Sequence, residues 1–150
     1  MLDTQRPPDE WQLRFEPEVR GAIEGKPIAL KSVDSAYGEY LERIRLMIKQ
    51  KWGYPCAKDV GTRHCDYKPT EVVVEFGIVK SGHVRYVMVL QPSEWSIYND
   101  YAVNAVRLGA PFPPVPRELM ARAAPESGEV RIVATFHYGF VNNTLNQEIR

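Results

Sequence analysis

Apolar residues recur at every third or fourth position between Tyr37 and Trp52, which is the spacing of one face of an α-helix. Charged residues fill most of the positions between them. Gly53 and Pro55 follow directly, and we expect them to end the helix, because glycine suits a C-terminal cap and proline cannot extend the backbone ladder. The pattern therefore predicts an amphipathic helix that packs on another layer of the domain.

Three further segments alternate apolar and other residues, which is the period of a β-strand. They are residues 72–78, 84–90 and 130–138. Ser81-Gly82 lies between the first two, where glycine supplies the positive backbone angle of a tight hairpin turn. Helical spacing returns between Tyr98 and Leu108. The predicted order is helix, strand, strand, helix, strand, which defines an α+β domain.

This order predicts two helices packed on one face of a three-stranded antiparallel sheet. The crossover through the second helix places the strand at residues 72–78 in the centre and leaves the strands at 84–90 and 130–138 as edges. An edge strand offers unpaired backbone groups to which a partner can add a strand. The strand at 130–138 has no internal proline and carries one full charge, Arg131, so we predict that a partner uses this edge.

A second apolar stripe is predicted on the sheet face turned away from the helices. It consists of Val73, Val87, Val89 and Val133. A stripe of this kind is a surface for another part of the chain or for a partner. The candidates are the segment at Trp11, Leu13 and Phe15, which alternates like a half-buried strand, a second subunit in a homodimer, or a different protein.

The composition suits one globular domain. The chain has 150 residues, of which 44% are apolar, and this is enough for a single core. Its 19 basic and 19 acidic residues cancel, which argues against nucleic acid as a partner, and no apolar run approaches the length of a membrane span. We assign residues 1–31 to an arm or the end of a linker, residues 32–140 to the domain, and residues 141–150 to a tail.

The sequence carries no glycine-rich phosphate loop, no paired catalytic signature and no familiar set of metal ligands, so we expect neither an enzyme nor a cofactor. The one sharp chemical signal is the pair Cys56 and Cys65. We favour a disulfide, which closes a loop of about ten residues and suits an oxidising compartment. The alternatives are free thiols, a metal site with His64 and Asp66 added, and a nucleophilic Cys65 beside His64.

Several motifs follow one another in a fixed order. They are Trp52-Gly53-Tyr54-Pro55, Lys80-Ser81-Gly82-His83-Val84, Ala102-Val103-Asn104-Ala105-Val106, Pro111-Phe112-Pro113-Pro114-Val115-Pro116 and Phe136-His137-Tyr138. With these motifs, residues 32–138 resemble the C-terminal domain of TonB energy transducers, in the TonB/TolA-like family. The chain departs from the family between Pro55 and Val72, where its link is longer.

The resemblance implies a periplasmic domain at the end of a proline-rich stalk that is anchored in the inner membrane. It implies that the domain captures an extended segment of an outer-membrane transporter by strand addition, and that it transmits force from a proton-driven ExbB/ExbD-like motor. The alternative partner is a fixed component of a trans-envelope motility or secretion machine, for which the domain would be a structural adaptor. The positions that match the partner-binding strand are Arg131, Ile132, Val133, Ala134, Thr135, Phe136 and His137, with Tyr54 and Pro55 as a second contact.

Overall fold

The computed structural model describes residues 25–31 and 36–150. The predicted docking of the segment at Trp11, Leu13 and Phe15 lies outside the described residues, as does most of the predicted arm. The last residues of that arm, 25–31, are described, and they join the domain through the first strand.

The described elements follow in the order β1 (Ile28–Ala29), α2 (Gly38–Lys49), β2 (Ala57–Lys58), β3 (Cys65–Asp66), β4 (Thr70–Ile78), β5 (Val84–Gln91), α3 (Ser96–Gly109), α4 (Arg117–Met120), β6 (Val130–Val141) and β7 (Thr144–Ile149). The two helices predicted from the sequence correspond to α2 and α3. The three predicted strands correspond to β4, β5 and β6, and β6 continues past the predicted end at Tyr138 to Val141.

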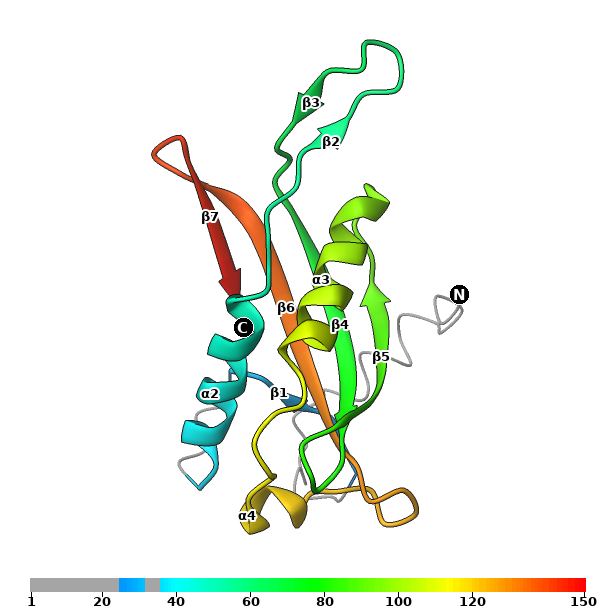
Figure 1. Ribbon diagram of the computed structural model, residues 1–150, viewed down its shortest axis with the longest axis vertical. Helices are drawn as coiled ribbons and strands as arrows, with labels where there is room; N and C mark the ends of the chain where they lie inside the picture. Colours follow the sequence, from blue (N-terminus) through cyan, green and yellow to red (C-terminus); the bar gives the residue numbers. More distant parts are fainter. Residues whose placement is uncertain (1–24, 32–35) are drawn as a thin grey trace.

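Five strands form one mixed sheet in the order β1-β6-β4-β5, with β7 also paired to β6 (Figure 1). The central position of β4 is as predicted, since it pairs antiparallel with both β5 and β6. The predicted three-stranded antiparallel sheet is wrong, because β1 adds to β6 in parallel and β7 folds back onto it. Neither strand was predicted from the sequence pattern, because β1 has two residues and β7 is mostly polar.

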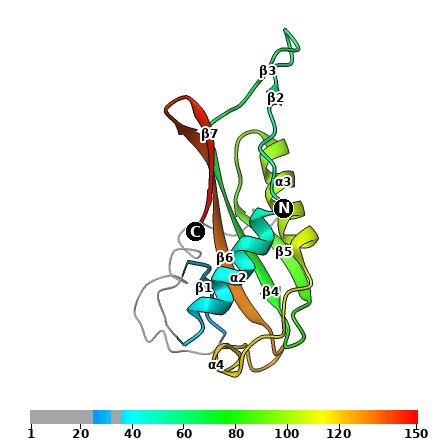
Figure 2. The same cartoon turned by 60° about the vertical axis from the view of Figure 1, so that its left-hand side comes forward.

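The predicted set of two helices and one sheet is also incomplete. A short third helix, α4, follows the proline run, and β2 and β3 form a separate two-stranded sheet. The β2–β3 hairpin projects beyond the end of the main sheet, on the same end of the molecule as the turn between β6 and β7 (Figures 1 and 2). The long link after Pro55 is therefore a projecting hairpin.

The helices α2 and α3 cover one face of the main sheet (Figure 2). Their buried positions face alternate residues of β4 and β6 and form one core with them. The fully buried core residues of these four elements include Leu41, Ile44, Ile48, Tyr98, Ala102, Val74, Phe76, Ile132, Phe136 and Tyr138. The helical and strand periods read from the sequence thus predicted the inward faces of α2, β4 and β6. For α3 they predicted Tyr98, Ala102 and Ala105 correctly, but Tyr101 and Leu108, expected on the same face, are 39% and 62% exposed.

The predicted role of Gly53 as a left-handed cap is wrong. The helix ends at Lys49, where the Lys51 N–H donates to the Ile48 carbonyl oxygen and tightens the last turn. Gly53 does not take a positive φ. It lies against the ring of Tyr101, where an added Cβ would come within 3.3 Å of Cε2. Packing between the post-helix segment and α3 therefore explains this glycine.

The prediction that four valines form an outward stripe is wrong at two positions. Val87 and Val89 lie opposite Phe76 and Val74 and pack against the core. The register between β4 and β5 shifts between Gly77 and Ile78, and an irregularity of this kind turns the following side chains to the other face. Alternation read along β5 alone cannot reveal this shift.

Candidate partner-binding edge and the disulfide finger

The outer edge of β6 is occupied, so the predicted free edge at this strand is wrong. β1 pairs in parallel with Ile132 and Val133, and β7 pairs antiparallel with residues 136–141. Between these two segments, Thr135 and Arg150 exchange backbone hydrogen bonds of 2.8 and 2.9 Å. Neither β1 nor β7 has a clear alternating pattern, so neither was predicted as a neighbour of β6.

The outward backbone groups of β6 are therefore engaged inside the chain. Hydrogen-bonded pairs alternate along an antiparallel ladder, and Thr135 with Arg150 is one such pair. The next pair is His137 with Glu148, and the Val133 carbonyl oxygen accepts a 2.8 Å hydrogen bond from the Leu30 N–H. A partner strand can reach these groups only by taking the place of β1 or β7.

The side chains of the predicted strand site contribute little surface. Ile132, Ala134 and Phe136 are fully buried, and Val133 is 7% exposed. On the opposite face, His137 Nδ1 lies 3.0 Å from Oε2 of Glu71, its direct neighbour on β4. Recognition at this strand would therefore depend on its backbone, which is how strand addition gains affinity.

β7 is held mainly by its ladder with β6. Among its residues Thr144–Ile149, only Ile149 is buried, at 2% exposure. Gln147 adds a 3.3 Å hydrogen bond from Nε2 to the Trp52 carbonyl oxygen. Burial of apolar area is the main stabilising term in folding, so a strand with one buried side chain is a low-stability element. β7 is thus the part of the sheet most suited to exchange.

The sequence reasoning missed β7, although one signal for it was present. Asn142 and Asn143 both have positive φ, of 52° and 65°, and join β6 to β7 in a two-residue turn. Two positive φ angles define the hairpin turn whose twist matches the flanking strands, and asparagine tolerates them better than most residues. The Asn-Asn pair directly after an alternating strand could have predicted this hairpin.

Tyr54 lies at the end of the sheet where the two hairpins project. Its ring centroid is 5.3 Å from that of Tyr138, 5.5 Å from that of Tyr67 and 6.2 Å from that of Phe140. Its hydroxyl donates to the Lys68 carbonyl oxygen at 2.9 Å, and burial raises the pKa of Tyr54 to about 12, so it stays a neutral donor at physiological pH. The structure thus brings Tyr54 to the far end of β6.

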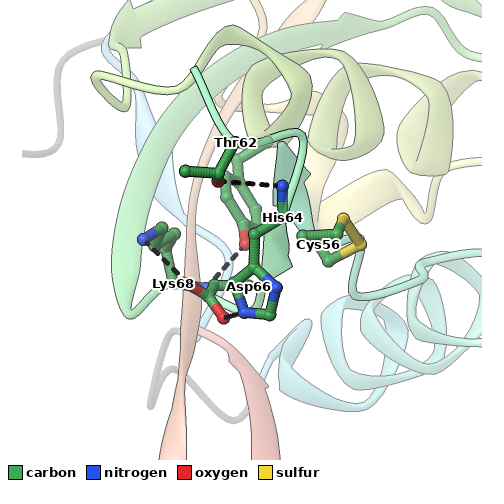
Figure 3. Close-up of a disulfide and its surroundings, with 7 residues drawn as sticks. Cys56, Thr62, His64, Asp66 and Lys68 are labelled. Atoms are coloured by element: carbon green, nitrogen blue, oxygen red, sulfur yellow. Dashed lines mark hydrogen bonds and ion pairs between the residues drawn. A yellow bond between two sulfur atoms is a disulfide. The ribbon is translucent and has the colours of Figure 1, made fainter. Parts of the chain in front are cut away.

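The predicted disulfide between Cys56 and Cys65 is present and closes residues 56–65 into a loop (Figure 3). We call residues 56–66 the disulfide finger. Its two strands pair Ala57 with Asp66 and Lys58 with Cys65, and the Asp59 N–H donates to the His64 carbonyl oxygen at 2.7 Å. Ala57 joins the domain core at 6% exposure, so the finger is fixed at its base.

The bond excludes the other predictions for the two cysteines in this state of the protein. Both thiols are consumed, and His64 Nε2 pairs with Asp66 Oδ1 at 2.9 Å (Figure 3). Asp66 also lies 3.7 Å from Lys68 Nζ. The two polar side chains proposed as metal ligands or as a base therefore contact each other on the surface of the finger, beside Lys68.

Removing the disulfide is expected to loosen the finger with little effect on global stability. In Cys56→Ser/Cys65→Ser, we expect a loss of less than about 1 kcal/mol, although the chain-entropy model gives roughly 3 kcal/mol for a loop of about 15 residues. The reason is that removal of the bond gives the finger more conformational entropy in the native state as well as in the unfolded state, so the two changes largely cancel. Urea unfolding gives the free energy, and hydrogen exchange at the Asp59 and Arg63 amides reports the finger. A global loss near 3 kcal/mol would contradict this expectation.

Residues 37–130 match the protein-family model described as TonB C terminal. The chain belongs to this family. TonB C-terminal domains are periplasmic domains of TonB-like energy transducers, and they interact with envelope proteins such as TonB-dependent transporters. The matched range ends at Val130, so the strand site predicted at Arg131 to His137 lies just beyond it. No curated protein and no solved structure matches the chain.

Two features are absent from the part of this TonB C-terminal domain that the structure describes. Over residues 25–31 and 36–150, no helix is long and apolar enough to cross a membrane. Over the same ranges, no group of three or more His, Cys, Asp or Glu side chains is placed to hold a metal ion.

Proposed function

We propose that the chain is the periplasmic partner-binding domain of a TonB-like energy transducer, the soluble part of a protein anchored in the inner membrane. In this proposal it captures an extended segment of an outer-membrane transporter and transmits force from a proton-driven ExbB/ExbD-like motor. It acts by binding and performs no catalysis. The family supports the general role, and the pairing of β7 with β6 supports the site of capture.

The observation that carries the proposal is that β7 is weakly held against the long strand β6. β6 spans Val130–Val141 and forms nine pairs with the central strand β4, so its inner edge is firmly fixed. Its outer edge is covered by β7, which buries only Ile149. An incoming strand that replaces β7 would regain the same backbone hydrogen bonds, so the exchange costs little in hydrogen bonding.

This mechanism modifies the strand addition expected from the sequence. The captured segment does not meet an open edge but competes with β7 for the outward groups of Thr135, His137 and the residues that follow. The apparent affinity for the captured segment is its intrinsic affinity multiplied by the fraction of molecules in which β7 is released. Partners that pair along the whole edge are therefore preferred, because they best offset this loss. Tyr54 and Phe140 lie beside the turn of the exchanging hairpin and would contact the same partner.

The proposal is tested by titrating the labelled chain with a peptide that carries the TonB box of an outer-membrane transporter from the source cell. The backbone amides of residues 131–137 and of β7 are expected to shift most, and the β7 amides are expected to lose protection from hydrogen exchange. Shifts confined to the disulfide finger would contradict capture at β6.

A covalent lock on β7 gives a sharper test. Phe140 and Leu145 are direct neighbours on β6 and β7, and they are 45% and 42% exposed, so Phe140→Cys/Leu145→Cys can form a cross-strand disulfide with little loss of core packing. Oxidation is expected to weaken peptide binding by at least about tenfold, because the exchange-competent state is removed. Reduction is expected to restore binding.

The two single cysteine variants control for loss of the Phe140 and Leu145 side chains. Wild-type chain treated with the same reductant controls for opening of the Cys56–Cys65 bond. Undiminished binding by the oxidised double variant would overturn the exchange of β7. An absence of binding in every variant would instead favour a structural adaptor that grips a different envelope protein.

A further inference from the structure

The disulfide finger and the start of α3 enclose a groove on the side of the finger formed by β2. The groove has a volume of about 570 Å³. Its apolar walls are Pro55, the Cys56–Cys65 disulfide, Ala57, Trp95, Ile97 and Tyr101. Ile97 and Tyr101 are large apolar side chains left 36% and 39% exposed. This volume lies within the range of sites that hold a ligand or an anchoring side chain.

The backbone along one wall of this groove is arranged as an unpaired strand edge. Asp59 and His64 form a hydrogen-bonded pair of the finger, so by alternation the N–H and C=O groups of Cys56 and Lys58 point away from β3. Pro55, Cys56, Ala57 and Lys58 all line the groove. The residues that carry the outward groups of β2 therefore line the same groove as the aromatic side chains of α3.

Two opposite charges flank the groove. Lys58 lies on the finger and Glu94 lies just before α3, and both are exposed. Neither forms an ion pair with another residue in the described part of the chain, whereas Lys68 pairs with Asp66 and sits 5.7 Å from the centroid of the Trp95 ring. The Lys68 ammonium thus lies against Asp66 and the Trp95 ring, and Lys58 and Glu94 are left to meet charges on a partner.

We propose that this groove is a second site for an extended segment of a partner protein, distinct from the β6 edge. The segment adds to β2 through the Cys56 and Lys58 backbone groups, and it places a large apolar side chain between Trp95, Ile97 and Tyr101. An acidic residue on the segment meets Lys58, and a basic residue meets Glu94. Backbone pairing combined with a side-chain pocket is the general form of strand-addition recognition.

The finger is what creates this site. The groove exists only because the link after Pro55 forms a hairpin that stands beside the first turn of α3, and the disulfide forms part of its wall. The long link that departs from the family pattern thereby gains a binding role. The site does not require exchange of β7, so it stands or falls independently of the capture proposed at β6.

Selection of random linear peptides displayed on phage, using the oxidised 150-residue chain as bait, tests the proposal. Enriched peptides are expected to contain a large apolar residue flanked by an acidic and a basic residue. A selected peptide is then titrated into the labelled chain. The Cys56 and Lys58 amides and the Trp95 indole N–H are expected to shift.

Variants on one helix supply the matched comparison. Ile97→Asp places a charge in the groove and is expected to weaken peptide binding by at least about tenfold, the scale of losing a buried anchoring contact. Leu108→Asp lies on the same helix at a position that is 62% exposed and outside the groove, and it is expected to bind normally. Lys58→Glu is expected to weaken binding and to be rescued by a peptide in which the acidic residue becomes lysine.

Each remaining outcome counts against the site. A failure to enrich any peptide, equal binding by Ile97→Asp, or shifts centred on β6 and β7 would overturn it. The Phe140→Cys/Leu145→Cys lock separates the two proposals, because oxidation is expected to block capture at β6 and to leave the groove peptide bound. Reduction of the Cys56–Cys65 bond in the wild-type chain is expected to weaken binding of the groove peptide and to leave capture at β6 intact.

Discussion

Replacing Gly82 with alanine is expected to cost about 3 kcal/mol or more of the free energy of unfolding. Gly82 has a φ of +97°, which strains any residue with a Cβ, and this conformation alone costs roughly 1–2 kcal/mol. An added Cβ would also lie 1.9 Å from the Phe112 carbonyl oxygen, a backbone atom. Relief of that clash requires the backbone to move, at a further cost of about 1–3 kcal/mol.

The clash also disrupts a contact that positions β6. The Phe112 N–H donates to the Gly82 carbonyl oxygen and the Val115 N–H donates to the Lys80 carbonyl oxygen, both at 2.9 Å. These two bonds fasten the proline run to the β4–β5 turn, and that run leads from α3 through α4 toward β6. We therefore expect Gly82→Ala to shift the amide resonances of α4 as well as those of the turn.

Gly128→Ala is the matched control. Gly128 has a φ of +70° but no atom within 4 Å of an added Cβ, so this variant isolates the conformational cost, about 1–2 kcal/mol. Urea or thermal unfolding measures both variants. Equal losses for Gly82→Ala and Gly128→Ala would contradict the role of the contact with Phe112.

The second large effect is expected for Tyr138→Phe, which we predict to cost about 2–3 kcal/mol. The Trp52 Nε1–H donates to the Tyr138 hydroxyl oxygen at 2.9 Å, and that hydroxyl donates to the Tyr98 carbonyl oxygen at 2.9 Å. Tyr138 is fully buried, so loss of its hydroxyl leaves the Trp52 indole N–H as an unpaired buried donor, whereas the Tyr98 carbonyl oxygen keeps its helical bond within α3. An unpaired buried donor costs roughly 1–3 kcal/mol, and the lost hydrogen bond to the Tyr98 carbonyl oxygen adds about 1 kcal/mol.

These hydrogen bonds join three elements of the candidate site. Tyr138 lies on β6, Trp52 follows α2, and Tyr98 lies in α3, so the hydroxyl ties both helices to the strand proposed to capture a partner. Burial raises the pKa of Tyr138, which keeps this hydroxyl protonated and able to donate. We expect Tyr138→Phe to increase hydrogen exchange along the second half of β6.

Tyr101→Phe is the comparison for this effect. Tyr101 is 39% exposed, and its hydroxyl forms no hydrogen bond with another residue in the part of the chain that the structure describes. Its change in unfolding free energy is expected to stay within about 0.5 kcal/mol, as for most surface substitutions. A loss for Tyr138→Phe as small as this would show that the Trp52 indole N–H finds another partner.

The disulfide finger, which forms one wall of the groove, and the β6–β7 turn lie toward the same end of the molecule (Figure 1). Tyr54 stands between them, in ring contact with Phe140 on β6 and with Tyr67 just after the finger. Two extended segments of one partner, or one segment from each of two partners, can therefore be held at this end. Joint binding of two linked segments raises affinity beyond either site alone.

The sequence predicted the elements with strong periodicity and placed their cores. The helical spacing from Tyr37 to Trp52 and the alternation from Val72 to Ile78 recur as α2 and β4, because a buried face forces apolar residues into the period of its element. The turn at Gly82 was also predicted, since few residues besides glycine accept its φ. The disulfide followed from the short spacing of the two cysteines.

Apart from the turn signal at Asn142 and Asn143, the accessibility of β6 was decided by tertiary structure. β1 is too short to show a period, and β7 gains its place mainly from backbone hydrogen bonds, which nearly every residue type can form and which leave little mark on composition. The shift that turns Val87 and Val89 inward has the same origin, because register is set between strands and not within one.

The sequence by itself therefore determined the family, the two main helices and the three principal strands, and it favoured the covalent link of the finger over free thiols, a metal site or a nucleophilic cysteine. These features depend on the spacing of residues that are close in the sequence, so the order of the residues is enough to predict them. Only the tertiary structure decided that β6 has neighbours on both edges and that the finger stands against α3 to form a groove. Both depend on which distant segments meet, and that choice is made by the packing of the whole chain.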